Sequence, residues 1–251
     1  MSNKALEGIQ NERDIVVNFN KNKKIIKELG LSKPQDLWAI HITSKKYGKL
    51  NDSLINCKAD LFIAKGIVDI QYLEKKNYYL NEKDAIKFNL TPIDYTGISV
   101  KLCNSRFTIF KMGVSIFKKL FGSNVLAAGA SIYSTKDFHK NESVLRGWEV
   151  SQNQFRSYFI DLIDNELDFL NNKEVLSRIK TSANEKIAKI ITSNKTISDF
   201  VFKGIGNFEE PFTASWLIED ETLKVNYEIP FSITTGSGRS KGVFTVVLKP
   251  R

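Results

Sequence analysis

The sequence has little cysteine and histidine and no long apolar run. Its two cysteines, Cys57 and Cys103, form no CxxC motif, which excludes a disulfide scaffold or a zinc finger and fits a reducing compartment. The two histidines leave few candidates for histidine-based catalysis, and His41 lies in an apolar run, so we interpret it as a hydrogen-bonded structural residue. No apolar run approaches the roughly 20 residues of a membrane span, and the N-terminal segment is polar. These absences predict a soluble, cytoplasmic protein with no membrane partner.

Acidic residues are missing from one long stretch of an otherwise basic chain. No Asp or Glu occurs from Tyr95 to Lys136, and the whole chain carries 37 Lys+Arg against 28 Asp+Glu, a net charge of +9. A surplus of this size favours a polyanionic partner such as nucleic acid, although a basic surface without a specific partner is the alternative. Within the acid-free stretch, Arg106, Lys111 and Lys118 are candidate contacts to a phosphate backbone.

The spacing of apolar residues predicts an α/β or α+β fold. The 251 residues suffice for one large domain or two small ones, and the chain shows no repeat and no clear linker that would justify two. We therefore expect a single domain. The expected helices are 5–28, 155–170 and 175–191, and the expected strands are 37–43, 55–65, 97–102, 212–218, 223–229, 231–235 and 243–248.

A glycine-rich loop is expected before the last strand, at residues 235–242. It carries Ser237, Arg239, Ser240 and Lys241 among its glycines. Arginine pairs bidentately with guanine, and hydroxyl and ammonium groups contact phosphate, so these residues are candidate DNA contacts; an ordinary flexible hairpin loop is the alternative. The loop is not a P-loop, because GxxxxGK[ST] is missing and no helix follows it.

Two expected strands carry the residues that point to chemistry. In 97–102, Ile98 and Val100 alternate with Ser99 and Lys101, so the hydroxyl and the ammonium group share one face of the strand. A lysine on a core strand costs desolvation energy unless an anion meets it, and Asp60 in the preceding strand can supply one. Asp60 is also a hard oxygen ligand that suits Mg²⁺. Lys101 can orient or deprotonate a water and stabilise negative charge, and the Val100 carbonyl is a further candidate metal ligand.

These residues resemble a known signature. Ala59-Asp60 and Ser99-Val100-Lys101 are similar to the two halves of the motif of the PD-(D/E)XK nuclease superfamily, specifically Type II restriction endonucleases, with Ala59 in place of the proline and Ser99 in place of the second acid. Segments that resemble small GCGC-recognising restriction enzymes are Gly8–Ile15 with Phe19 after it, Val100–Leu102 with Asn104-Ser105, Gly204–Phe208, and Gly238-Arg239.

The resemblance implies a central mixed β-sheet flanked by helices and Mg²⁺-dependent cleavage of double-stranded DNA at a short site, leaving 5′-phosphates. It implies Glu12 as the acid that replaces the one missing at Ser99, a cognate DNA methyltransferase as genetic partner, and a homodimer as one state of assembly. The expected parts of one nuclease domain over 1–251 are an N-terminal helix (1–30), a catalytic core (37–122), a helical part (123–203), and C-terminal strands with a DNA-contacting loop (204–251).

Some alternatives remain open at this point. The separation of Asp60 from Lys101, 101 − 60 = 41 positions, is wider than the resemblance implies, so Asp69 and Asp94 are rival metal acids and 66–95 is expected to be an inserted hairpin or loop. A DNA repair or structure-specific nuclease of the same fold would carry the same residues. In a non-catalytic DNA-binding protein, Lys101 would hold a phosphate and Asp60 would be a hydrogen-bonded core acid.

Overall fold

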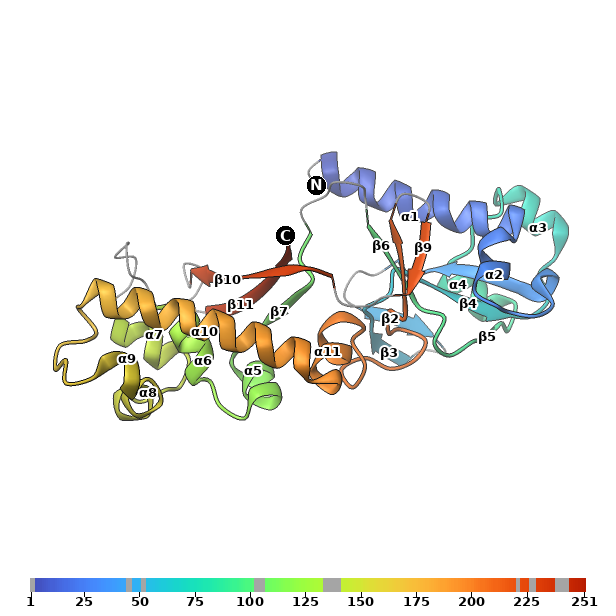
Figure 1. The fold of residues 1–251 in the computed structure, drawn as a ribbon. Coiled ribbons are helices and arrows are strands. Elements are labelled where there is room, and N and C mark those ends of the chain that lie inside the picture. The colour runs from blue at the N-terminus through green and yellow to red at the C-terminus, as the bar shows by residue number, and fades with distance from the viewer. Residues whose placement is uncertain are drawn as a thin grey trace. The chain divides into compact units, whose positions relative to one another are not determined.

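A computed structural model describes residues 3–43, 47–50, 53–101, 107–132, 141–219, 222–225, 229–237 and 244–251. These residues form two compact units, each of which is described by itself (Figure 1). Unit 1 is Met1–Ser105 with Phe202–Tyr227, and unit 2 is Arg106–Val201 with Glu228–Arg251. Because each unit combines separate stretches of chain, no single linker marks the boundary. That residues 1–251 act as one nuclease domain stays a prediction.

In the described part of unit 1, a six-stranded mixed sheet forms the centre. The strands are β1 (Leu37–His41), β4 (Leu61–Lys65), β5 (Thr91–Pro92), β6 (Ile98–Lys101), β8 (Trp216–Glu219) and β9 (Thr222–Val225), in the order β1-β4-β6-β8-β9 with β5 beside β4. β4 is antiparallel to β6 on one side and to β1 on the other, whereas β6 and β8 run parallel. A separate hairpin pairs β2 (Tyr47–Leu50) with β3 (Ser53–Asn56).

Helices cover both faces of this sheet. On one face, α1 (Asn3–Asn22) and α2 (Lys24–Glu28) contribute Ile15, Phe19 and Ile26 to an apolar cluster with Leu61, Ile63, Ile98 and Val100. On the other face, α3 (Ile70–Lys75) and α4 (Glu82–Lys87) contribute Leu73 and Ala85 to a cluster with Phe62 and Ala64. Successive strand residues point to opposite faces, which is why neighbours such as Leu61 and Phe62 join different clusters. The expected mixed sheet flanked by helices is confirmed.

Gly97 stands at the start of β6, where the segment that leads into β8 passes very close. A Cβ at this position would collide with the carbonyl oxygens of Thr213 and Pro211. The same approach lets the Trp216 amide donate to the Gly97 carbonyl at 3.0 Å, at the beginning of the parallel pairing of β6 and β8. The glycine is therefore required by the closeness of two backbones rather than by a turn.

Among the described residues of unit 2, a three-stranded antiparallel sheet packs against helices (Figure 1). The strand order is β10 (Phe231–Ser237), β11 (Phe244–Pro250), β7 (Phe110–Met112). The helix α6 (Val125–Ser131) is buried along its whole length between this sheet and α10 (Lys173–Ser193). Small residues make that packing close: a Cβ on Gly129 of α6 would meet Phe159 and Ala183. Further helices are α5 (Val114–Phe121), α7 (Asn141–Gly147), α8 (Gln152–Tyr158), α9 (Ile160–Ile163) and α11 (Lys195–Phe202), the last of which ends in unit 1.

Several expected elements differ in the structure. The helix expected over 155–170 is wrong: α8 ends at Tyr158 and α9 at Ile163, because Asp164 adopts a positive φ of 50° that ends the helix. The expected insertion at 66–95 contains the helices α3 and α4 instead of a hairpin. Asp69 caps α3 by accepting from the Tyr72 amide, and Asn81 caps α4. The helix at 175–191 and the C-terminal strand pairs are confirmed.

Within the described part of the chain, no helix combines the length and the apolar character needed to cross a bilayer.

Candidate active site

Asp60 lies immediately before β4, and its backbone is held by the strands on both sides. Its amide donates to the Ile98 carbonyl of β6 at 2.8 Å, and its carbonyl accepts from the Ile42 amide after β1 at 2.9 Å. Backbone hydrogen bonds on both sides leave the main chain little freedom. The carboxylate of Asp60 is therefore carried by a rigid position near the centre of the sheet.

The Asp60 carboxylate meets the three residues that the sequence singled out on the next strand. Its Oδ2 accepts the Val100 amide at 2.7 Å and lies 3.3 Å from the Ser99 hydroxyl, which donates to it. The Lys101 ammonium group lies 3.8 Å from the same oxygen. The acid and the lysine that are far apart in the sequence are thus brought together on paired strands. Their catalytic roles stay predictions.

This pair faces away from α1 and is reachable from solvent. Ile98 and Val100 belong to the apolar cluster under α1, so Ser99 and Lys101 project from the opposite face of β6. The side chains of Lys101 and Asp60 are 24% and 22% exposed. A charged pair at this depth keeps part of its hydration, and a phosphate group can approach both side chains.

Ser99 stands where the nuclease signature has a second acid, and its contacts suggest a different task. It is buried, and its hydroxyl donates to Asp60. A hydroxyl in this position orients the carboxylate, whereas an acid would add a second negative charge close to it. Ser99 is therefore a positioning residue for Asp60 in this geometry.

Lys58 is a member of this group that the sequence reasoning missed. Its amide donates to the Phe212 carbonyl at 2.6 Å, and the residue is only partly exposed. Burial, together with the nearby charge of Lys101, lowers the Lys58 pKa from 10.5 to about 7, and the charge of Asp60 opposes this shift. The available signal was its spacing, because residues two apart on an extended segment share a face, and Lys58 precedes Asp60 by two.

Glu82 adds a second carboxylate near this group, from the first turn of α4. It is buried, and its Oε2 accepts from the Thr43 hydroxyl at 2.8 Å and from the Thr43 amide at 3.1 Å. Glu82 also acts on Cys57: burial, together with the charges of Asp60 and Glu82, raises the pKa of the Cys57 thiol to about 12. No local sequence pattern indicates that Glu82 lies near this group, because α4 belongs to the segment expected to be an inserted hairpin or loop.

The raised pKa of Cys57 predicts an unreactive thiol. In the folded chain, alkylation of Cys57 by iodoacetamide near about pH 8 should be at least roughly 30-fold slower than in the unfolded chain, because less thiolate is present although each thiolate is more nucleophilic. Because folding raises the pKa of this thiol, its alkylation rate in the folded chain keeps rising above about pH 9, where the alkylation rate in the unfolded chain levels off. Mass mapping of a Cys103→Ser protein measures this, and equal rates in the two states would contradict the shift.

Glu12, the acid expected to complete the metal site, binds a histidine. Its Oε2 lies 3.1 Å from His41 Nε2, and His41 Nδ1 lies 2.7 Å from the Tyr79 hydroxyl. Because a carboxylate only accepts, His41 Nε2 donates to Glu12. His41 is buried and hydrogen-bonded through both ring nitrogens, as expected; that its role is structural stays a prediction. Glu12 approaches from the α1 face, next to the β1 residue that pairs with Leu61, whereas Lys101 projects from the other face; that Glu12 binds the metal stays a prediction.

The two rival acids lie elsewhere. Asp69 caps α3 through the Tyr72 amide at 2.7 Å, beyond the end of β4 that is opposite to Asp60. Asp94 is exposed in the turn before β6. Of these three acids, Asp60 is the one whose contact with Lys101 the structure describes.

The expected DNA contacts are only partly described. Lys111 on β7 and Lys118 on α5 are exposed. Ser237 is the last residue of β10. Arg106, Arg239, Ser240 and Lys241 lie outside the described residues.

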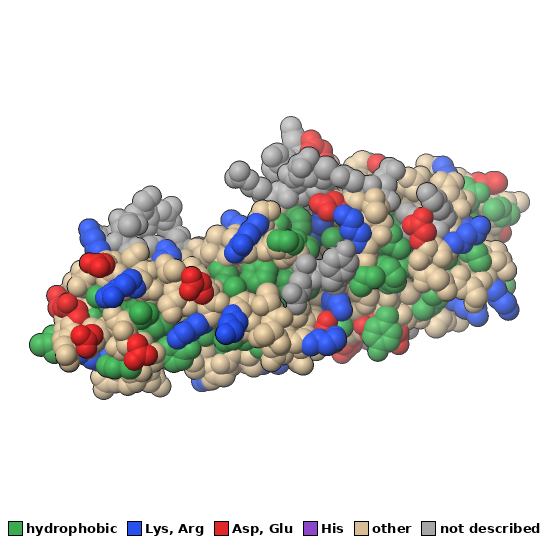
Figure 2. Space-filling model, viewed as in Figure 1, with side chains coloured by type: hydrophobic (Ala, Val, Ile, Leu, Met, Phe, Trp, Pro, Cys, Tyr) green, Lys and Arg blue, Asp and Glu red, His purple; other side chains and the backbone are tan. Residues whose placement is uncertain are grey.

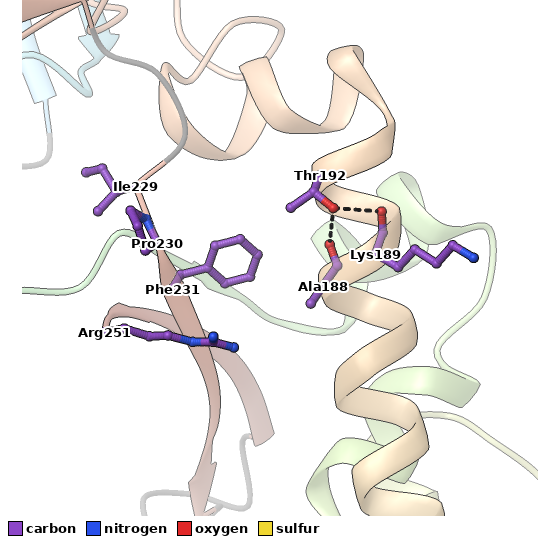
Figure 3. A pocket seen from close by; sticks show the side chains of 7 residues that line it. All are labelled: Ala188, Lys189, Thr192, Ile229, Pro230, Phe231 and Arg251. Atoms are coloured by element: carbon purple, nitrogen blue, oxygen red, sulfur yellow. Dashed lines mark hydrogen bonds between the residues drawn. The ribbon is translucent and has the colours of Figure 1, made fainter.

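A cavity of about 360 Å³ in unit 2 has no comparable chemistry. Figure 3 shows Phe231 and Arg251 opposite Thr192 and Ala188 of α10. The Thr192 hydroxyl donates to helix carbonyls, so it is not an activated nucleophile. With no carboxylate or histidine among its lining residues, which are Ala188, Lys189, Thr192, Ile229, Pro230, Phe231 and Arg251, the cavity offers no general base.

The donors around Asp60 fit Mg²⁺. Val100 directs its amide at Asp60, and the N–H and C=O of one strand residue point to the same side, so its carbonyl also faces the strand of Asp60. One carboxylate with a carbonyl matches Mg²⁺, which takes few protein oxygens and completes its shell with water and substrate phosphate. Within the described ranges, no three His, Cys, Asp or Glu side chains group closely enough to hold a metal ion.

Comparisons of the chain with protein-family models, with curated proteins and with solved structures found no match.

Proposed function

We propose that this protein is a Mg²⁺-dependent endonuclease that cleaves double-stranded DNA at a short specific sequence, as a Type II restriction endonuclease of the PD-(D/E)XK superfamily does. The observation that carries the proposal is the contact of Asp60 with Ser99, Val100 and Lys101 across paired strands. An acid that can bind a metal ion and a lysine that can stabilise negative charge are two of the groups that metal-dependent phosphodiester hydrolysis uses.

Each residue has a distinct task in the proposed reaction. Asp60 and the Val100 carbonyl would hold the cation, and Ser99 orients the carboxylate through its hydrogen bond. Lys101 holds the attacked phosphate and stabilises the negative charge that develops on it. Mg²⁺, when bound, polarises the phosphate and makes a coordinated water more acidic. The products would carry 5′-phosphates.

The charge distribution supports DNA as the substrate. The chain has a net charge of +9, and a basic protein attracts a phosphodiester backbone. In the site, the Lys101 ammonium group lies beside the Asp60 carboxylate and is partly exposed, so a phosphate can approach it. A homodimer and a cognate methyltransferase belong to the proposal only through the resemblance to restriction enzymes.

Incubation with unmethylated phage DNA tests the proposal. We expect discrete fragments with Mg²⁺, no cleavage with EDTA, and no cleavage by Asp60→Asn protein, because the amide cannot replace the anionic ligand. A smear in place of discrete bands would instead assign a nuclease without sequence specificity, such as a repair or structure-specific enzyme. Binding without any cleavage would identify a non-catalytic DNA-binding protein and overturn the proposal.

A further inference from the structure

The three-stranded sheet of unit 2 has one face against helices and one face that carries lysines. Phe244 of β11 packs against Gly147 of α7, and Phe110 of β7 against Phe200 of α11. Because strand residues alternate, Lys111 of β7 and Lys249 of β11 project from the opposite face. These two lysines come from parts of the chain that only the strand pairing brings together.

The strand register places the lysines on one small area. Lys111 pairs with Val247, which pairs with Thr234 on the far strand. Lys249 is two residues beyond Val247 and pairs with Ser232. Cβ atoms in such diagonal positions are about 7–8 Å apart or less, so both ammonium groups can reach adjacent phosphates. We call these five residues the lysine face.

The lysine face is open to solvent in the described part of the structure. Lys111, Lys249 and Thr234 are exposed, and Ser232 and Val247 are partly exposed. The Thr234 and Ser232 hydroxyls lie 3.3 and 3.5 Å from carbonyls of β11, to which they donate. Their donor hydrogens are therefore used within the sheet, so recognition of an anion depends on the two lysines.

The charge of this face is of one sign. β7, β10 and β11 contain no Asp or Glu in their sequences FKM, FSITTGS and FTVVLKP. The helices of the same unit carry both signs, as α10 does with Glu174, Glu185, Lys173 and Arg178, and Figure 2 shows red and blue side chains interspersed over α10 and its neighbours. A solvated surface normally mixes signs in this way, so the absence of acids on the sheet strands needs another reason.

We infer that the lysine face is a docking surface for the phosphate backbone of duplex DNA, separate from the Asp60–Lys101 pair. The inference rests on the proposed function in taking DNA as the polyanion. Duplex DNA carries closely spaced phosphates along its backbone, and two ammonium groups this close together can contact neighbouring phosphates. The face exposes no aromatic or other large apolar side chain to insert into a bilayer, which favours DNA over an acidic membrane.

Salt-dependent DNA binding tests this inference. The affinity of the whole chain for a short fluorescent duplex is measured by anisotropy over a range of salt, with EDTA present to prevent cleavage. The double variant Lys111→Ala/Lys249→Ala should bind every sequence more weakly, and the slope of log K against log salt should become shallower by about 1.8, because each phosphate contact contributes about 0.9.

The matched control is Lys75→Ala/Lys173→Ala, which also removes two exposed lysines. It should leave the slope unchanged, since an equal loss in both variants would mean that only net charge matters and would overturn the inference. Amine-selective acetylation of the wild-type protein gives a readout that does not depend on folding of a variant. Duplex DNA should protect Lys111 and Lys249 more than Lys173; equal labelling with and without DNA would overturn the inference.

Failure of this inference differs from failure of the proposed function. Wild-type protein that cuts DNA while the double variant keeps the wild-type salt slope overturns the lysine face and leaves the nuclease standing. Wild-type protein that binds with Lys111 and Lys249 protected but never cuts supports the lysine face and overturns the nuclease.

Discussion

Replacing Lys101 by alanine is expected to slow DNA cleavage by about 10²–10³-fold, the loss that follows removal of one group that stabilises a charged transition state. The Lys101 ammonium group is the cation next to Asp60 Oδ2, at 3.8 Å, and is partly exposed to an incoming phosphate. Single-turnover cleavage with saturating enzyme measures the chemical step, so weaker binding does not enter the rate. The variant should still bind duplex DNA, with a salt slope lowered by about one unit.

Lys65→Ala is the matched control. Lys65 is also the last residue of a strand of the same sheet, β4, but it lies at the end of β4 that is opposite to Asp60 and it is exposed. The Lys65→Ala protein should cleave DNA at the wild-type rate. Cleavage by Lys101→Ala at the wild-type rate would remove the lysine from the mechanism, and Lys58, whose pKa is affected by both Lys101 and Asp60, would be the next residue to replace.

Gly97→Ala is expected to destabilise unit 1 by about 3 kcal/mol or more, the upper part of the range for inserting a methyl group where no space exists. The obstructing atoms are backbone carbonyl oxygens of Thr213 and Pro211, which cannot move aside as a flexible side chain can. Separation of the two segments would stretch the hydrogen bond from the Trp216 amide to the Gly97 carbonyl. Thermal denaturation should show a midpoint lowered by about 6–12 °C.

Gly113→Ala provides the comparison for this loss. Gly113 precedes α5 with a φ of −89°, which any residue adopts, and a Cβ there meets no atom within 4 Å. Its cost should stay below about 1 kcal/mol. Equal denaturation midpoints for Gly97→Ala and Gly113→Ala would contradict the close approach of Gly97 to the segment before β8.

Much of the candidate site could be predicted from alternation along single strands. The pattern of Ile98, Ser99, Val100 and Lys101 places the hydroxyl and the ammonium group on one face whatever the partner strand is. The same alternation applied to Asp60 would have included Lys58. These predictions succeed because a strand has a period of two that depends only on local backbone geometry.

Local signals failed where capping decided the structure. The apolar spacing of 155–170 favours one helix, yet Asp164, with a φ of 50° and a ψ of −131°, departs from helical geometry and ends α9. The polar segment 66–95 looked like a loop, but Asp69 and Asn81 accept from the first backbone amides of α3 and α4. Side-chain hydrogen bonds to the first backbone amides stabilise these short helices although their apolar pattern is weak. The helix α4 formed in this way places Glu82 near Cys57.

The sequence by itself determined the types and local orientation of the groups: an acid before one strand, a hydroxyl and a lysine on one face of another, and a basic chain with an acid-free stretch. The tertiary structure decided which acid meets Lys101, since Asp60, Asp69 and Asp94 differ in their place in the sheet and not in chemistry. It also decided that Lys111 and Lys249 share a face. The physical reason is that side-chain direction is set within a strand, whereas proximity across a sheet is set by the pairing of segments far apart in the chain.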